Sequence, residues 1–197
     1  MTGNRLATFR RVVPGFTVVE LLVAITLFSL MSLVLVQTFV SFNRLHRRTA
    51  NAAVLGQDAR FAMELLVREA RNKRLEYPAG AQLPAVGPNV FLRGADGSTV
   101  ELAMRGDVAT CGPKTPSCLG LSVDGGASWA PVTSNLVEVT RFDVHIRPPV
   151  DPFANGSVTD IQPFFTVVLG LRYLDPDPRN RATIEAQTSV SSRVYAR

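Results

Sequence analysis

The sequence lacks the short motifs that most often identify an enzyme. It contains no G-x-S-x-G, H-E-x-x-H, C-x-x-C, G-x-G-x-x-G or P-loop pattern, which excludes the best-known hydrolase, zinc-protease, dithiol and nucleotide-binding arrangements. Neither histidine, His46 or His145, has an acid or nucleophile arranged around it in the sequence, so we interpret both as surface residues. We therefore expect no catalytic residue and no cofactor.

A metal site has little support either. The segment "LDPDPRN" offers Asp175 and Asp177, but Arg179 occupies the position of the third ligand in an EF-hand-like loop. We predict a turn stiffened by proline and no metal here, and a calcium site is the alternative.

Cysteine is scarce, since the chain holds only Cys111 and Cys118, within "CGPKTPSC". In an exported domain such a pair can close a small loop as a disulfide, whereas a metal site would need four ligands and neither histidine is near in the sequence. We predict a disulfide, and two free thiols are the alternative.

Lysine is almost absent, and the positive charge is unevenly spread. Only Lys73 and Lys114 are lysines, a bias that we attribute to genomic base composition. The formal net charge is +5, but residues 1–15 hold three arginines and no acid, so 18 of the 21 basic residues remain against 16 acidic ones in the rest of the chain. This near balance gives only weak support to a nucleic-acid partner.

Charge is also missing from one long apolar stretch. Between Phe16 and Phe42 the only charged residue is Glu20, and an apolar helix of about 20 residues spans a bilayer. A secretory signal has an apolar core of only about 7–15 residues and ends in small residues before its cleavage site. This stretch is longer than such a core and does not end in small residues. We therefore predict one transmembrane helix over residues 16–42.

The apolar stretch opens with "GFTVVELLVA", which resembles the cleavage and methylation motif of type IV prepilins and type II secretion pseudopilins. The resemblance implies that a prepilin peptidase removes the basic leader, residues 1–15, by cutting after Gly15. The same enzyme would then methylate the new terminal amine of Phe16. Glu20, at the fifth position after the cut, would serve in subunit assembly.

The position of Glu20 also has a physical explanation. A carboxylate costs about 2.5–3.5 kcal/mol at the centre of a membrane helix and less towards its end. In a helix that begins at Phe16, Glu20 would lie about 6 Å from the start, near the positive end of the helix dipole. The new amine of Phe16 is a natural counter-ion, in the same helix or in a neighbouring subunit, and the resemblance favours the neighbour. A tolerated interfacial charge is the alternative.

Arginines flank the predicted span on both sides. Three precede it, and Arg44, Arg47, Arg48 and Arg60 follow it, so the positive-inside rule does not decide the orientation. We follow the cleavage motif, which places the N-terminus in the cytoplasm before cleavage and the rest of the chain outside the inner (cytoplasmic) membrane. The arginines after the span would suit lipid head groups or DNA, although a plain charged helix face is the simpler interpretation.

No proline occurs between Pro14 and Pro78, so one helix can extend from Phe16 to about Glu76. Its second half, residues 43–76, is amphipathic. The predicted apolar stripe consists of Leu45, Ala52, Leu55, Ala59, Ala62 and Leu66, with Arg60, Glu64, Arg68 and Arg71 away from it. We expect this stripe to pack on a globular head, and the first half of the helix to face lipid or other helices.

The head, residues 77–197, changes to short β-like runs separated by Gly and Pro. The candidate strands are 89–93, 98–104, 119–123, 128–132, 135–147, 164–174 and 182–195. They predict one antiparallel sheet packed on the helix, and hence an α+β, pilin-like fold. The segment "SVDGGASW" matches the Asp-box of sialidase-like propellers, and we interpret it as a single hairpin turn with no sialidase activity implied.

Two further segments, "GQDARFAMELLVREARNKRLEYP" and "TIEAQTSVSSRVYAR", resemble J-type minor pseudopilins and PilW-like minor pilins. In these families the first segment follows the membrane helix and the second forms the final strand. The pattern of the first segment is supplied here by Gln57, Asp58, Arg60, Ala62, Met63, Leu66 and Arg68.

Together these features predict a minor pilin or pseudopilin, a structural subunit at the tip of a type II secretion pseudopilus or a type IV pilus. It would act in protein secretion or in the initiation of pilus assembly. The expected partners are prepilin peptidase, other pilins or pseudopilins through the N-terminal helix, and the inner-membrane assembly platform. The alternatives are a competence pseudopilin that binds DNA for uptake and a membrane-anchored extracytoplasmic enzyme.

Overall fold

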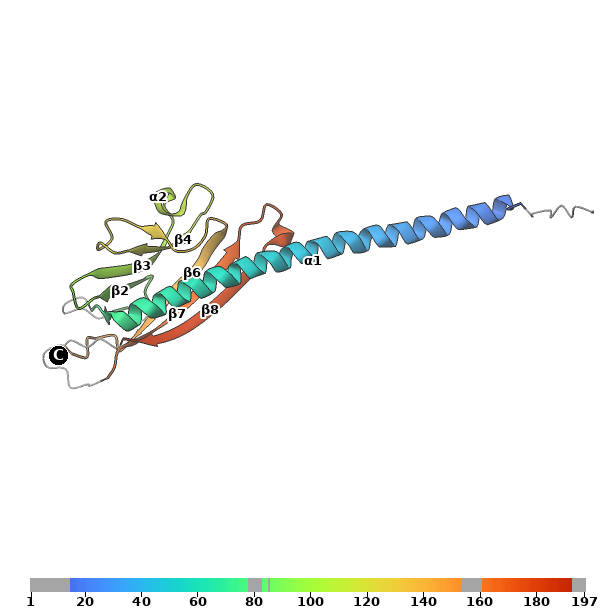
Figure 1. Ribbon diagram of the computed structural model, residues 1–197. Coiled ribbons are helices and arrows are strands. Elements are labelled where there is room, and N and C mark those ends of the chain that lie inside the picture. Colours follow the sequence, from blue (N-terminus) through green and yellow to red (C-terminus); the bar gives the residue numbers. More distant parts are fainter. Residues whose placement is uncertain (1–14, 78–82, 85, 154–160, 193–197) are drawn as a thin grey trace, which may run out of the picture. The chain divides into compact units, whose positions relative to one another are not determined.

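The structure is a computed structural model that describes residues 15–77, 83–84, 86–153 and 161–192. The chain divides into two compact units, residues 1–45 and 46–197. The long helix α1, Val18–Asn72, contributes to both units, and all strands belong to the second (Figure 1).

Both ends of α1 differ from the predicted bounds of Phe16 and Glu76. The helix begins two residues later because Thr17 caps it, as described below. It ends at Asn72 because the chain then extends into β1, Arg74–Leu75, which pairs with β2, Asn89–Arg93, through Leu75 and Leu92. A two-residue strand has no periodicity that a sequence pattern could reveal.

The first sheet is antiparallel and has the order β1-β2-β3-β4-β5. Its remaining strands are β3, Thr99–Arg105, β4, Cys118–Ser122, and β5, Ala130–Pro131. A four-residue helix, α2 (Val108–Cys111), lies between β3 and β4. β5 stays short because Pro131 has no backbone N–H to offer to a continued ladder.

The second sheet is also antiparallel and has the order β6-β7-β8. It is formed by β6, Val137–Arg147, β7, Phe164–Tyr173, and β8, Thr183–Ser191, with a 3-10 turn, Pro178–Asn180, before β8. Each predicted strand overlaps an observed one, and the α+β class with a long N-terminal helix is confirmed. The prediction of a single sheet was wrong, because the chain leaves the first sheet after Pro131 and starts β6 in a separate ladder.

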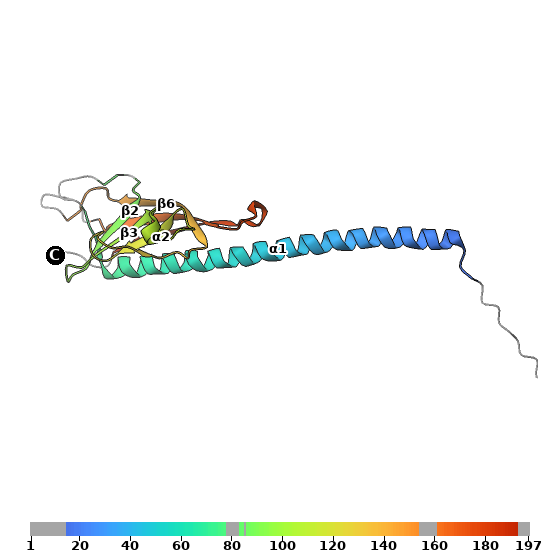
Figure 2. The same cartoon turned by 90° about the horizontal axis from the view of Figure 1, so that it is seen from above.

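The second half of α1 packs on the inner faces of both sheets, which lie on the same side of the helix (Figure 2). The buried helix residues are Leu55, Ala59, Ala62, Leu66 and Ala70, each at most 4% exposed. Small side chains at three of these positions let the helix backbone approach the strands closely. The prediction was wrong for Leu45, which is 64% exposed, and for Ala52, which is also exposed, because the core begins only at Leu55.

Polar contacts fix the helix to the loops of the head. Asp58 Oδ2 accepts a hydrogen bond from the backbone N–H of Ser134 at 2.9 Å. At the other end of the contact, the hydroxyl of Ser192 donates to the carbonyl of Lys73 at 2.7 Å. Asp58 thus joins α1 to the segment that connects the two sheets.

The Asp-box segment forms the turn between β4 and β5, with Asp124 at its centre. Asp124 Oδ1 accepts hydrogen bonds from the Ser122 hydroxyl at 2.7 Å and from the Ser128 backbone N–H at 2.9 Å. The Ser128 hydroxyl donates to the other carboxylate oxygen. These hydrogen bonds, those from Ser128 above all, lower the pKa of Asp124 to about 2, because they favour the charged form.

The same turn holds the only tryptophan of the chain, Trp129. Its indole N–H donates to the carbonyl of Gly126 at 3.0 Å, and the guanidinium of Arg105 lies 4.6 Å from the ring centroid. Gly120 leaves the room for this stack, since a Cβ there would come within 2.9 Å of the indole and 2.7 Å of the Arg105 side chain. Trp129 therefore reports on the folded state of the first sheet.

Replacing Leu66 by alanine should destabilise the head by about 2–5 kcal/mol, because the change opens a cavity between α1 and the sheets. Urea unfolding of the full chain in neutral detergent, followed by Trp129 fluorescence, measures this change. Leu45→Ala is the matched control on the exposed part of the same helix and should change the unfolding free energy by less than about 0.5 kcal/mol. Equal losses in the two variants would contradict the observed start of the core.

Replacing Asp124 by asparagine should lower the unfolding temperature of the head at pH 7. The folded pKa of Asp124 lies below its ordinary value, so its contribution to stability is present above about pH 4 and is lost as the pH falls towards 2. The difference in unfolding temperature between the wild type and Asp124→Asn should therefore shrink over that range. A difference that is the same at pH 2 and pH 7 would show that the carboxylate charge does not stabilise the turn.

Candidate processing and assembly site

The predicted cleavage site lies in an exposed, non-helical segment, residues 15–17, directly before α1. Phe16 is 85% exposed. A Cβ added at Gly15 would meet no atom within 4 Å, and the backbone there has no positive φ. Packing within this chain therefore does not require a glycine at position 15, and the bond between Gly15 and Phe16 is open to an enzyme.

Thr17 and Glu20 form a capping box at the start of α1. The backbone N–H of Glu20 donates to the Thr17 hydroxyl at 3.2 Å, and the backbone N–H of Thr17 donates to Glu20 Oε2 at 3.4 Å. This reciprocal pair satisfies two amides that a helix start leaves without partners. Our sequence interpretation missed it, although the spacing Thr-x-x-Glu is the usual signal of such a cap.

The cap leaves Glu20 available for a stronger partner. Its present acceptor contact is to a neutral amide at a long distance, 3.4 Å. Cleavage after Gly15 would create a positively charged amine on Phe16, and a hydrogen bond between charged groups is shorter and about twice as strong as one between neutral groups. The carboxylate could then exchange the amide of Thr17 for an amine without leaving the helix start.

The helix that follows has the composition of a membrane span. α1 contains a window with a mean hydropathy of 2.5 and none of that window is buried, so by length and composition it is able to cross a membrane. Three of its hydroxyl groups are satisfied within the helix: Thr26, Ser29 and Thr38 each donate to a carbonyl three or four residues earlier at 2.8 Å. No polar hydrogen-bonding group of these side chains would face hydrocarbon without a partner.

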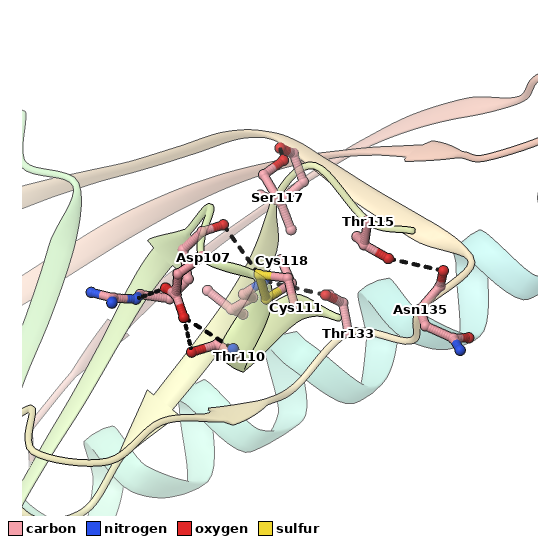
Figure 3. The surroundings of a disulfide bond; sticks show 11 residues. Asp107, Thr110, Cys111, Thr115, Ser117, Cys118, Thr133 and Asn135 are labelled. Carbon is pink, nitrogen blue, oxygen red and sulfur yellow. Dashed lines mark hydrogen bonds and ion pairs between the residues drawn. A yellow bond between two sulfur atoms is a disulfide. The ribbon is translucent and has the colours of Figure 1, made fainter. Parts of the chain in front are cut away.

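In the head, the structure joins Cys111 and Cys118 by a disulfide, with their Cα atoms 5.4 Å apart (Figure 3). Cys111 ends α2, whose N-terminus is capped by Asp107 through the backbone N–H of Thr110 at 2.9 Å. Arg105 in turn donates to Asp107 at 2.8 Å. The disulfide thus fastens a capped turn of helix to the first residue of β4, and closing so short a loop contributes about 2.5 kcal/mol in the chain-entropy description.

The loop closed by the disulfide also reaches the second sheet. The hydroxyl of Ser117 donates to the carbonyl of Val139 at 2.5 Å, and the backbone N–H of Val139 donates to the carbonyl of Ser117 at 3.0 Å. Thr115 donates to the carbonyl of Asn135 at 2.9 Å (Figure 3). The segment before β4 therefore links the two sheets.

The remaining candidates from the sequence serve no shared site. His46 is exposed and His145 is half-buried on β6. Asp175 and Asp177 accept hydrogen bonds from the backbone N–H groups of Asp177 and Arg179 at 2.9 and 3.0 Å, as in a tight turn. Among the described residues, no group of three or more potential metal ligands occurs.

The comparison with known families agrees with the N-terminal geometry. Residues 10–36 match the family model described as the prokaryotic N-terminal methylation motif. No curated protein and no solved structure matches the chain. The matched motif supports the class of type IV pilins and pseudopilins, a structural subunit rather than an enzyme. It implies processing by a prepilin peptidase, anchoring in a membrane and assembly with other pilins.

Proposed function

We propose that this protein is a minor pilin or pseudopilin that is cut after Gly15, methylated on Phe16 and built into a filament through the first half of α1. The observation that carries the proposal is the combination of the methylation motif over residues 10–36 with an exposed, non-helical segment at residues 15–17. An apolar helix half with no buried side chain follows directly. Such a helix needs lipid or neighbouring helices around it.

The proposed division of the chain follows from these properties. Residues 1–15 are the leader, 16–42 the membrane and filament helix, 43–76 the stem that joins the head, and 77–197 the head. We place the head outside the cytoplasmic membrane and the leader in the cytoplasm. The disulfide between Cys111 and Cys118 supports this orientation, because disulfides persist in oxidising compartments and are rare in the cytoplasm.

The proposed position is the tip of a secretion pseudopilus or of a type IV pilus, as in the J-type and PilW-like proteins that the stem resembles. Three residues of the shared stem pattern have a role in packing here. Ala62 and Leu66 lie in the core, and Asp58 holds the segment between the two sheets. In this proposal the pattern consists in part of residues that attach the head to the stem.

In this proposal Glu20 pairs with the methylated amine of Phe16 of a neighbouring subunit. The carboxylate lies at the first turn of an apolar helix, where an unpaired charge is unfavourable in lipid. An incoming amine neutralises it and thereby sets the register between two helices. The assembly platform in the membrane would present one subunit to the next.

Mass spectrometry of the protein isolated from its host should find a mature N-terminus at Phe16 carrying one added methyl group. Gly15→Leu should remain uncut, because the larger side chain would block the peptidase, whereas its Cβ would meet no described atom within 4 Å. Unchanged Trp129 fluorescence in that variant would show that its head still folds. A wild-type protein that keeps residues 1–15 in cells with an active prepilin peptidase would contradict the proposal.

Three variants separate the cap from the charge at Glu20. Glu20→Gln keeps an acceptor for the Thr17 amide but removes the charge, and Glu20→Ala removes both. Both should be cut normally, yet their incorporation into filaments should fall by at least about tenfold, which corresponds to a lost interaction of about 1.4 kcal/mol. Thr17→Ala loses part of the cap, keeps the charge and should assemble like the wild type.

Filament incorporation is measured by immunoblotting of sheared filaments against the membrane fraction. Normal incorporation of Glu20→Gln, together with a loss in Thr17→Ala, would show that Glu20 acts as a helix cap and not as a counter-ion.

A further inference from the structure

Four exposed arginines lie near the start of the second unit, residues 46–197. We call them the basal patch: Arg47 and Arg48 on α1, and Arg179 and Arg181 between β7 and β8. The loop is held beside the helix by Asn51. Its amide donates to Asp175 Oδ2 at 3.1 Å and to the carbonyl of Asn180 at 3.0 Å. Two segments that are far apart in the sequence therefore bring their cations to the same place.

The acids in this region offset the positive charge of the basal patch only in part. The two carboxylate oxygens of Asp175 accept hydrogen bonds from the backbone N–H of Asp177 and from the side-chain amide of Asn51. Asp177 accepts a hydrogen bond from the backbone N–H of Arg179. Within the ranges that the structure describes, no arginine of the patch forms an ion pair with a carboxylate. The patch thus carries four positive charges against two nearby carboxylates and stays positive overall.

Asp175 nonetheless shows how close these charges lie. Its pKa is lowered mainly by the hydrogen bond from the backbone of Asp177, and the positive charge of Arg47 adds to the effect. Arg181 donates from Nε to the backbone carbonyl of Asp175 at 3.1 Å. The helix and the loop therefore place their arginines around the same residue.

The face of α1 that carries the patch changes character along the helix. Arg48, Asn51 and Leu55 follow one another at steps of three and four, so they lie on one face. From Leu55 onward this face is buried in the core. Before Asn51 the same face presents guanidinium groups, at a point only five or six residues after Phe42, the end of the apolar run.

The distance to the membrane is short. At about 1.5 Å per residue, Arg47 and Arg48 lie about 8–9 Å beyond Phe42 along the helix. An arginine side chain can extend its charge back towards the interface while its stem covers apolar surface. By the helix rise alone, Arg47 and Arg48 of the basal patch are therefore within reach of the phosphate layer that borders the hydrocarbon.

We propose that the basal patch binds the phosphate groups of anionic phospholipids in the leaflet that faces the head. Guanidinium groups bind phosphate through two parallel hydrogen bonds, which a compact ammonium group cannot provide. The patch would hold the head against the membrane before the subunit enters a filament. Lipid phosphates also explain why arginines follow the span on a side where the positive-inside rule does not expect them. DNA offers the same phosphate chemistry, but the position beside the span favours lipid.

The test uses the full chain in neutral detergent, incubated with equal amounts of phosphatidylglycerol and phosphatidylcholine. Native mass spectrometry then measures the ratio of the two lipids retained on the protein. We expect the wild type to retain phosphatidylglycerol preferentially. The double variant R48Q/R179Q should lose most of this preference, by up to about 25-fold, since each arginine near an anionic surface contributes about fivefold.

The two substitutions are chosen because neither side chain forms a hydrogen bond or ion pair with another described residue. R60Q/R71Q is the matched control, since both arginines are exposed on α1 within the head unit and the change in charge is equal. The control should keep the wild-type ratio. Trp129 fluorescence checks folding, and R47Q/R48Q replaces the first variant if that one does not fold.

Four results would overturn the inference. The first is a wild type without a lipid preference, the second is a folded patch variant that keeps the wild-type ratio, and the third is a control that loses as much as the patch variant. Displacement of phosphatidylglycerol by a short DNA duplex, or by free inorganic phosphate at the same ionic strength, would show that the patch serves another phosphate source.

The inference rests on the membrane-anchored state in the proposed function, but the two fail separately. A protein that is cut at Phe16 and resists carbonate extraction from membranes, yet shows no lipid preference, rejects only the basal patch. A protein that carbonate removes from the membranes rejects the proposed function as well.

Discussion

The fold of the head depends on the burial of one helix face. The two sheets touch each other through few backbone contacts, such as the bridge between Gly87 and Val144 and the hydrogen bond between Val139 and Ser117. α1 completes the core they share, since Leu55, Leu66 and the alanines between them pack against residues of both sheets. The stem is therefore part of the core, and a head without residues 55–70 would expose the inner faces of both sheets.

Much of this fold could be predicted because it follows from periodicity. Steps of three and four identified Leu55 and Leu66, and alternation identified β6 and β7. Periodicity names the face of a helix but not where its partner begins, so Leu45 and Ala52 were assigned to the core by mistake. The division into two sheets was missed for a similar reason, because alternation says nothing about which strands share a ladder.

The processing site at Gly15 and Phe16 stays a prediction, and its local structure was missed. The motif is recognised from the order of Gly15, Phe16 and Glu20 at the start of a long apolar run. The cap between Thr17 and Glu20 was missed because Glu20 was interpreted only as a charge and not as a hydrogen-bond acceptor. For the cysteines, the sequence spacing did not reveal the geometry of the backbone. Two cysteines seven residues apart do not reveal whether their backbones approach closely enough, and here the cap at Asp107 positions Cys111 beside Cys118.

The open space around Gly15 separates the folding of the chain from its proteolytic maturation. In the proposed function the requirement for glycine at this position comes from the peptidase, so folding and maturation would depend on different residues. A precursor that escapes its enzyme would still fold its head and insert its stem, and would persist as a sound but unusable subunit. Proteases and chaperones that recognise unfolded protein would not remove it. Only the peptidase that recognises the cleavage site would distinguish the precursor from the mature subunit.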